Sequence, residues 1–323
     1  MKAVRFHRFG GPDVLSYEEV REPDVGPGDV LIRVAAAGVN FSDVMRRAGV
    51  YNPDLPLPHA EGVEAAGTVE RVGDAVTGAK PGDRVLTMLG QRCQAEYVVA
   101  PEALVHPIPP TLSFEAAGAL PLASLTAYHL LKTGAGLRPG ESVLIHAAAS
   151  GVGTFAVQLA KLWGARVFAT ASTDEKLAAV RALGADETIN YARENFVAEV
   201  LARTDKRGVD VVLECVGGEV LAQSVKALTP GGRLLIYGRA SGVAGAVAGD
   251  EILTRNLSVL GLHLGRRPWR PDMHREAFGE IIQLAVAGRL TPVVDRLFPM
   301  AEVAEAHAYM AARRTTGKLL LIP

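Results

Sequence analysis

Between residues 142 and 238, short apolar runs alternate with stretches of helical periodicity, and this alternation limits the possible folds more than any other feature of the chain. The apolar runs are rich in Val, Leu and Ile. Buried parallel strands have this near-continuous apolar character because helices cover both faces of their sheet. The segment therefore predicts an α/β fold with a doubly wound parallel sheet of the Rossmann type.

The first hundred or so residues have a different pattern, in which short apolar runs are separated by turn sequences such as GPGD and KPGD. This pattern predicts a compact, mostly β domain with one short helix at 42–49. The tail contains two helical stretches and the strand GKLLLIP, and we expect it to return to this first domain. The 323 residues suit two domains. The expected limits are 1–122 with 267–323 for the first domain, and 123–266 for the second.

The composition excludes several classes of function. Hydrophobic residues make up 49% and charged residues 21% of the chain, and the formal net charge is −1. A balance this close to neutral argues against binding to nucleic acid or to an anionic membrane surface. Cys93 and Cys215 are too few for a disulfide framework or a four-thiolate zinc lobe. With no signal-like segment and no apolar run of about 18 residues, we expect a cytoplasmic enzyme.

The loop His146–Gly153, HAAASGVG, has part of the G-x-G-x-x-G pattern of dinucleotide-binding loops and lies between an apolar strand and a helical stretch. The first turn of such a helix presents unpaired N–H groups and the positive end of the helix dipole, which favour phosphates. We expect Ser150, Gly151, Val152 and Gly153 to bind a pyrophosphate, with the glycines allowing close backbone approach. The alternative is a strand–helix turn without a ligand.

The end of the next strand, RVFATA, indicates which nucleotide fits. NAD-selective folds place a carboxylate there for the ribose 2′-hydroxyl, whereas this strand ends at Ala171. Asp174 is the nearest acid, but Ser172 and Glu175 have the spacing of a capping box, which predicts that Asp174 faces solvent in a first helical turn. Ser172 and Lys176 instead suit a 2′-phosphate dianion, so we expect NADPH as the cofactor. The alternative for Lys176 is a solvated helix lysine.

Several stretches carry a resemblance to a known family: AAAGVNFSDVMRRAGVY, VEAAGTVERVGDAVTGAKPGDRV, LPLASLTAYHLL, HAAASGVGTFAVQLAK, ALGADETINY and GKLLLIP. Through them the whole chain resembles the medium-chain dehydrogenase/reductase superfamily, and more narrowly its zinc-independent quinone oxidoreductases, the zeta-crystallin-like branch. The resemblance implies a GroES-like catalytic domain from both chain ends, a Rossmann domain between them, and an active site in the cleft. Ser150 departs from the branch, in which a glycine is often found at this position.

The same resemblance bears on metal binding. In zinc-dependent relatives, ligands stand at the positions of Asn40, Val63 and roughly Leu122 of this chain. None of these side chains is a usual tetrahedral zinc ligand, so the resemblance implies a metal-free site. The nearby His59 and Glu61, in the sequence HAE, are interpreted as surface structure in a proline-rich loop rather than as a metal site.

Without a metal ion, only hydrogen-bond donors can polarise an acceptor carbonyl. The resemblance places Asn40, Tyr51 and Thr126 near the nicotinamide, where the Tyr51 phenol and the Asn40 amide could donate. Structural alternatives remain: Asn40 capping the following helix, Tyr51 packing against PLP, and Thr126 capping a helix end.

The resemblance also places Tyr191 and Arg313 around the 2′-phosphate, together with Lys176.

We therefore expect an enzyme that uses NADPH to deliver hydride to a quinone or another conjugated carbonyl. One alternative is a reductase of enoyl thioesters or alkenals, for which the basic segment 266–271 could contact a phosphopantetheine arm. Another is an RNA-binding or structural protein of the zeta-crystallin type, which the net charge makes less favourable. The segment 256–265, NLSVLGLHLG, predicts an apolar edge strand, and the resemblance suggests that it pairs with its own copy in a homodimer.

Overall fold

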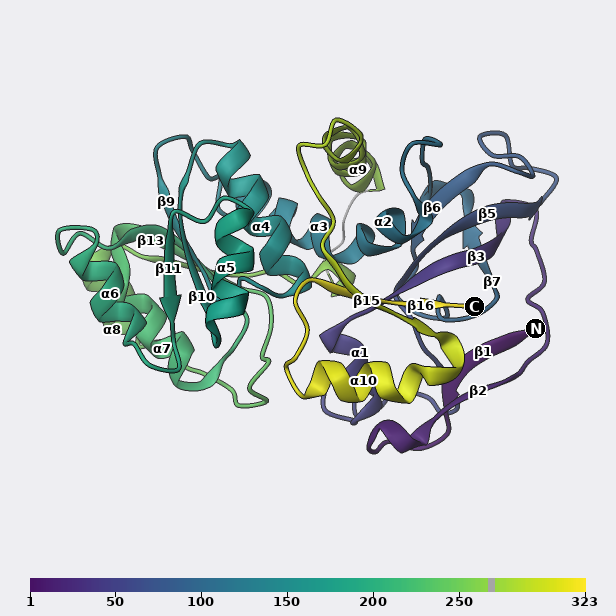
Figure 1. Cartoon of the computed structure of the whole chain (residues 1–323), viewed down its shortest axis with the longest axis horizontal. Coiled ribbons are helices and arrows are strands. Elements are labelled where there is room, and N and C mark those ends of the chain that lie inside the picture. Colours follow the sequence, from purple (N-terminus) through teal and green to yellow (C-terminus); the bar gives the residue numbers. More distant parts are fainter. Residues whose placement is uncertain (267–270) are drawn as a thin grey trace. The chain divides into compact units, whose positions relative to one another are not determined.

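The computed structural model describes residues 1–266 and 271–323, and its contacts divide the chain into two compact units (Figure 1). The first unit comprises Met1–Leu125 and the described residues 271–323. The second begins at Thr126 and includes the described residues through 266. None of the helices in the described ranges is both long and apolar enough to cross a membrane.

The second unit is built on a six-stranded sheet in which all neighbouring strands pair in parallel, in the order β11-β10-β9-β12-β13-β14. β9 and β12 are buried along their whole length, which accounts for their continuous apolar sequences. The predicted Rossmann-type sheet is confirmed, and its strand order reverses between β9 and β12, where such sheets bind ligands. The strands are β9 (Ser142–Ile145), β10 (Arg166–Ala171), β11 (Glu187–Asn190), β12 (Val209–Glu214), β13 (Leu228–Ile236) and β14 (Ser258–Gly261).

Helices cover both faces of this sheet (Figure 1). α4 and α5 contact β9, β10 and β11 from one face, whereas α6, α7 and α8 share a hydrophobic core with the strands on the other. This alternation is the one that the sequence predicts. The helices are α3 (Pro121–Tyr128), which leads into the unit, α4 (Gly151–Leu162), α5 (Asp174–Ala182), α6 (Phe196–Ala202), α7 (Gly218–Lys226) and α8 (Gly249–Arg255), and a π-helical turn spans His129–Gly134.

The sheet of the second unit ends at β14, which pairs only with β13 among the described strands. The predicted edge strand is therefore present, but it covers Ser258–Gly261 rather than the whole segment 256–265. The chain leaves the sheet after Gly261 and forms a 3-10 turn at Leu264–Arg266. Along β14 the Val259 side chain is half-buried and that of Leu260 is 38% exposed, so the edge presents apolar surface.

The first unit contains two antiparallel-rich sheets, as the GroES-like prediction requires. Its larger sheet has the order β15-β16-β3-β5-β6-β8 with β7 also paired to β3, and a smaller sheet has the order β2-β1-β4. The strands are β1 (Lys2–Phe6), β2 (Leu15–Glu19), β3 (Asp29–Val39), β4 (His59–Ala60), β5 (Glu64–Val72), β6 (Arg84–Met88), β7 (Tyr97–Pro101), β8 (Val105–Pro107), β15 (Val294–Pro299) and β16 (Lys318–Ile322). The helices are α1 (Phe41–Arg47), α2 (Phe114–Ala119), α9 (Pro271–Val286) and α10 (Val303–Ala311).

The C-terminal strand β16 joins the first unit, as the sequence predicts. It pairs antiparallel with β3, with Leu319 opposite Val39 and Leu320 opposite Gly38. This register brings the start of β16 to the end of β3, where α1 begins. Polar residues from the two ends of the chain therefore meet at one place within the first unit.

Candidate functional site

The start of α4 has the geometry of an anion-binding helix end. Ser150 occupies the N-cap, and its Oγ accepts a hydrogen bond from the Gly153 N–H at 3.1 Å. The N–H groups of Gly151 and Val152 have no partner among the described residues. The serine that replaces the usual glycine therefore caps the helix and leaves two N–H groups for a ligand, at the positive end of the helix dipole.

Gly153 is required by the close approach of α4 to the loop that precedes it. A Cβ atom at this position would lie 2.5 Å from the carbonyl oxygens of Ala147 and Ala148. The loop itself is fixed to the sheet, because the Ala148 N–H donates to the Thr170 carbonyl at 3.0 Å. The glycine thus holds the helix end against the carboxyl end of β9, as expected for a close-packed dinucleotide loop.

The end of β10 has no acid available for a ribose. Ala171 is buried at the strand end, and Asp174 is bound to Arg193, at 2.6 Å, and to the Asn190 amide, at 3.0 Å. Asp174 lies in the first turn of α5 with a 64% exposed side chain, as predicted. The predicted capping box is wrong, because Thr173 rather than Ser172 occupies the N-cap and accepts from the Lys176 N–H.

The side chains expected around a 2′-phosphate come from different elements. Ser172 is half-buried just before α5, and Lys176 lies in the first turn of that helix. Tyr191 follows β11 and is 46% exposed. Arg313 belongs to the first unit, where it follows α10 with a left-handed φ of 57°. The second unit therefore brings the first three residues to the carboxyl edge of β10 and β11.

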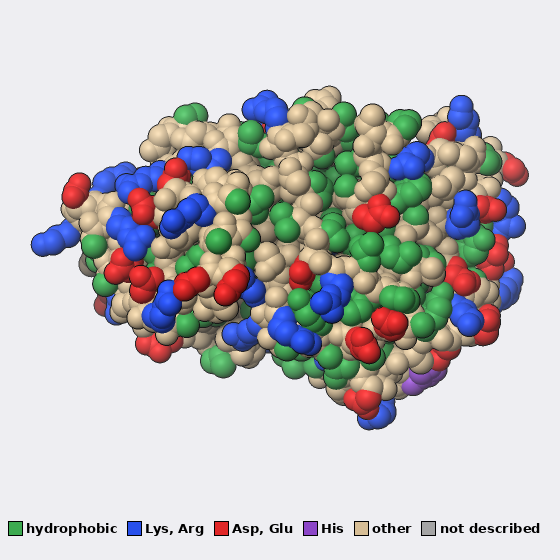
Figure 2. All heavy atoms as spheres, viewed as in Figure 1, with side chains coloured by type: hydrophobic (Ala, Val, Ile, Leu, Met, Phe, Trp, Pro, Cys, Tyr) green, Lys and Arg blue, Asp and Glu red, His purple; other side chains and the backbone are tan. Residues whose placement is uncertain are grey.

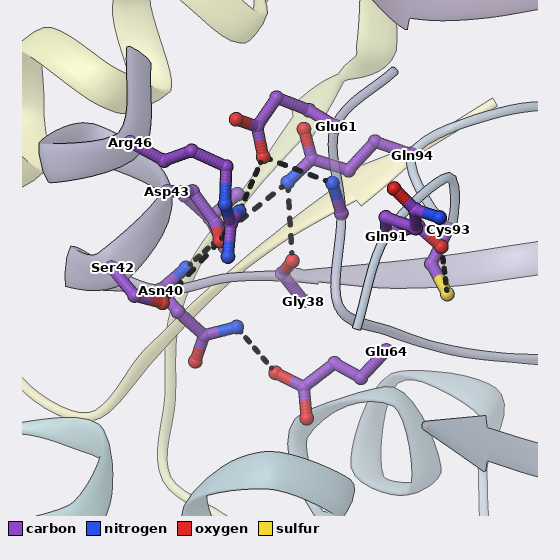
Figure 3. A network of polar contacts seen from close by, with 12 residues as sticks. Gly38, Asn40, Ser42, Asp43, Arg46, Glu61, Glu64, Gln91, Cys93 and Gln94 are labelled. Carbon is purple, nitrogen blue, oxygen red and sulfur yellow. Dashed lines mark hydrogen bonds and ion pairs between the residues drawn. The ribbon is translucent and has the colours of Figure 1, made fainter. Parts of the chain in front are cut away.

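In the first unit, Asn40 lies in a buried charged network (Figure 3). It stands at the N-cap of α1, where its backbone N–H donates to the Asp43 carboxylate at 2.9 Å. Its side chain points elsewhere: Nδ2 donates to Glu64 Oε1 at 2.8 Å, and Oδ1 accepts from Lys318 Nζ at 2.6 Å. The capping alternative thus describes the position of Asn40 but not the bonds of its amide.

A second ion-pair group adjoins this network (Figure 3). Arg46 donates to Asp43 at 3.1 Å and to Glu61 at 2.9 Å, and both carboxylates are fully buried. Burial raises the pKa of Glu61, and the neighbouring Asp43 carboxylate raises it further, while Arg46 opposes both effects. The Arg46 guanidinium lies over the Tyr51 ring, with its Cζ atom 5.8 Å from the ring centroid. The Arg46 group therefore forms a rigid, buried support beside Asn40 and Tyr51.

The interpretation of the HAE sequence as surface structure is wrong. His59 is 6% exposed and Glu61 is fully buried, because β4 pairs antiparallel with β1 and folds this segment over the core. Burial, with Arg46 and Arg92 nearby, lowers the pKa of His59 to about 4, so its ring is neutral at physiological pH. His59 and Glu61 are therefore part of the protein interior rather than of its surface.

Thr126 lies inside α3 and is 8% exposed. The alternative that it caps a helix end is wrong, since α3 continues to Tyr128 and the π-helical turn follows directly. Thr126 opens the second unit, whereas Asn40 and Tyr51 belong to the first.

The comparisons with known proteins agree with this architecture. The family profile described as "Alcohol dehydrogenase GroES-like domain" matches residues 26–110, and that described as "Zinc-binding dehydrogenase" matches residues 151–284. A quinone oxidoreductase of Pseudomonas aeruginosa is 39% identical over 100% of this chain and 99% of its own. A 2-haloacrylate reductase of a Burkholderia species is 38% identical over 99% of this chain and 98% of its own. The structure of Escherichia coli quinone oxidoreductase complexed with NADPH is 32% identical, with a TM-score of 0.94 over the full length of both chains.

The chain belongs to the quinone oxidoreductase family. One matching profile is described as zinc-binding, yet the positions of the expected zinc ligands hold other groups in this member of the quinone oxidoreductase family. Val63 is buried and apolar, and the backbone N–H of Leu122 donates to the Glu64 carboxylate. The ammonium of Lys318 lies beside Asn40. Within residues 1–266 and 271–323, no group of three or more His, Cys, Asp or Glu side chains could hold a metal ion.

Two charged groups of this quinone oxidoreductase family member were not anticipated from the sequence. The sequence predicts for Lys318 only a place in the strand GKLLLIP, although a lysine next to the apolar run LLLI can indicate a buried partner. Arg193, which neutralises Asp174, follows β11 and has no sequence signal that links it to α5. Both depend on strand pairings between distant segments.

Proposed function

We propose that this chain is a metal-free reductase that transfers a hydride from NADPH to a quinone or another conjugated carbonyl. The observation that carries the proposal is the arrangement around Asn40. At this position, where the resemblance puts a zinc ligand in zinc-dependent relatives, the amide is held between an ammonium and a carboxylate. Such a group can offer a hydrogen bond to an oxygen but has none of the Lewis acidity of a metal ion.

The residues of the second unit fit NADPH. The N–H groups of Gly151 and Val152, which have no partner in the part of the chain that the structure describes, suit a pyrophosphate together with the capping Ser150 and the close-packed Gly153. The engagement of Asp174 by a guanidinium removes the acid that would select a free ribose hydroxyl. Ser172, Lys176 and Tyr191 would hold the 2′-phosphate, with Arg313 as a further cation from the first unit. NADPH is also the ligand in the structure of the Escherichia coli relative. When bound, it supplies the hydride.

We propose that Asn40, Tyr51 and Thr126 bind the carbonyl oxygen of the substrate that accepts the hydride. Addition of hydride to a conjugated carbonyl leaves negative charge spread over an enolate, and neutral donors are sufficient to stabilise it. The Tyr51 phenol can donate, and the Arg46 guanidinium against its ring keeps the ring in place. An isolated alkoxide concentrates its charge on one oxygen, so oxidation of simple alcohols should be negligible without a Lewis acid.

A turnover panel tests the proposal. The purified protein is assayed with NADPH or NADH against small quinones, enones, enoyl thioesters and simple alcohols. We expect turnover with NADPH and the conjugated carbonyls, and slower turnover for Tyr51→Phe because one donor is lost. Absence of activity with every conjugated acceptor would overturn the proposal. A Tyr51→Phe variant with unchanged kcat would remove Tyr51 from the acceptor site and favour the packing alternative.

A second candidate within the same fold is reduction of the double bond of a conjugated acid derivative. The specific observation is the 38% identity to a protein named 2-haloacrylate reductase. The basic segment 266–271, proposed to contact a phosphopantetheine arm, includes residues 267–270, which lie outside the described residues. The comparison of quinones with enoyl thioesters and haloacrylates in the same panel separates the two candidates.

An RNA-binding role receives no support from the face of the molecule drawn in Figure 2. On the face drawn in Figure 2, Lys and Arg side chains intermingle with Asp and Glu rather than forming a patch of one sign. Proteins that bind nucleic acid usually present a continuous basic face. A mobility-shift assay with single-stranded RNA at low and high salt would expose this alternative if it were correct.

We also propose a homodimer formed through β14. Its apolar edge would otherwise be an aggregation hazard, and a two-fold axis lets it pair with its own copy. A cytoplasmic location remains an expectation from the sequence.

A further inference from the structure

The ammonium of Lys318 is enclosed by acceptors. Its side chain is 2% exposed, and that of its ion-pair partner Glu64 is fully buried. Lys318 Nζ donates to Glu64 Oε1 at 2.6 Å, to Asn40 Oδ1 at 2.6 Å and to the Val39 carbonyl at 3.3 Å. The three acceptors match the three hydrogens of the ammonium. This residue therefore has one defined position rather than the mobility of a surface lysine.

The Glu64 carboxylate is also held in one position, because both of its oxygens accept hydrogen bonds. Its Oε1 accepts from Lys318 and from Asn40 Nδ2, and its Oε2 accepts from the Leu122 N–H. Gly38 provides the space, because a Cβ atom there would overlap the Glu64 carboxylate. The carboxylate is thus seated over β3 and presents an acceptor to Asn40 from a fixed direction.

These neighbours determine which way round the Asn40 amide lies. An ammonium can only donate and an ionised carboxylate can only accept. A flipped amide would place its NH2 against the ammonium and its carbonyl against the carboxylate, which would replace two attractive contacts by two repulsive ones. The orientation with Oδ1 toward Lys318 and Nδ2 toward Glu64 is therefore imposed by chemistry. Among the described residues Nδ2 donates only to Glu64, so its second hydrogen remains for a further partner.

We propose that Lys318 is a positioning residue which, together with Glu64, holds the Asn40 amide so that it offers an N–H to the acceptor oxygen. This inference rests on the proposed function, since Asn40 is assigned there to the acceptor. It adds a rule of specificity: the site favours substrates that present a hydrogen-bond acceptor at this point, such as a carbonyl oxygen.

The test removes the charged pair without leaving a single buried charge. In Lys318→Met/Glu64→Gln, the amide loses both charged neighbours that fix its orientation, and no unpaired ion remains. We expect kcat with NADPH and a small quinone to fall by about 10–100-fold, less than the roughly 100–1000-fold loss on removing an oxyanion donor outright, with the KM for NADPH unchanged. In an Asn40→Ala background the same pair of substitutions should change kcat by less than about 2-fold, because the positioned group is absent.

Further variants separate positioning from a general structural effect. Arg233→Met breaks a mostly buried ion pair with Glu141 in the second unit, so it should lower thermal stability without changing the response to Asn40→Ala. If the double variant does not fold, Lys318→Gln/Glu64→Gln, in which both groups are neutral and can donate or accept, should give the same loss of kcat.

A readout that needs no turnover distinguishes failure of this inference from failure of the proposed function. The Asn40 carboxamide can be followed by NMR with 15N-labelled asparagine and assigned by its disappearance in Asn40→Ala. We expect two well-separated Nδ2 proton signals in wild type and a collapsed pair in the double variant. Unchanged Asn40 signals, or an equal loss of kcat in both backgrounds, would overturn the positioning role. Intact NMR effects in a protein without reductase activity would overturn only the proposed function.

Discussion

Gly153→Ala perturbs the contact that holds α4 against the nucleotide loop. The new methyl group would start 2.5 Å from the carbonyl oxygens of Ala147 and Ala148, both of which are backbone atoms that cannot rotate away. An ordinary contact requires the helix end to move by about 1 Å. Such overpacking costs about 1–3 kcal/mol of stability. The displaced N–H groups of Gly151 and Val152 would also lose bonds to a charged phosphate, so we expect NADPH binding to weaken by roughly 1–3 kcal/mol.

The effects of Gly153→Ala are measured by urea unfolding and by titration of NADPH followed by calorimetry. Gly279→Ala is the matched control, because this glycine is exposed in α9 and its added Cβ would meet nothing within 4 Å. The control should be stabilised by about 0.5–1 kcal/mol, the gain of alanine over glycine in a helix, and should bind NADPH normally. Wild-type stability together with wild-type NADPH affinity in Gly153→Ala would refute the close approach and the phosphate site.

Three further predictions concern the cofactor, the interface and pH. Lys176→Ala should weaken NADPH binding by roughly 1–3 kcal/mol and leave NADH binding nearly unchanged, as measured by calorimetry; equal wild-type affinity for the two cofactors would contradict it. Val259→Pro should disrupt a β14 interface by removing an edge-strand N–H, and light scattering that finds the variant still dimeric would exclude this edge. Burial raises the pKa of Glu61 to about 8, so the folded state retains a proton that the unfolded chain releases above 4.5. The free energy of unfolding should therefore fall as pH rises from 4.5 to about 8, and it should fall less steeply in Glu61→Gln. Urea unfolding across that pH range measures both slopes.

The periodic parts of the fold were predictable because they depend on local sequence. The alternation of apolar strands and helices required a covered parallel sheet, and the turn-rich first hundred residues required a β domain. The precise cap of α5 was not predictable, since Ser172 and Thr173 are both good caps and only the course of the backbone selects Thr173.

The charged network was missed because it joins segments far apart in the sequence. Lys318 and Asn40 are 278 positions apart, and only the pairing of β16 with β3 brings them together. The burial of His59 and Glu61 likewise depends on the pairing of β4 with β1. A histidine and an acid in a proline-rich segment are more often exposed, so local sequence favoured the wrong interpretation.

We propose above that hydride transfer to a conjugated carbonyl needs the donors around Asn40 and no metal ion. The direct measurement is the rate of NADPH oxidation with a small quinone or enone before and after exhaustive chelation, with metal analysis of the same protein. We expect an unchanged rate and no stoichiometric zinc. Stoichiometric zinc, together with ethanol oxidation that chelation abolishes, would contradict the proposal.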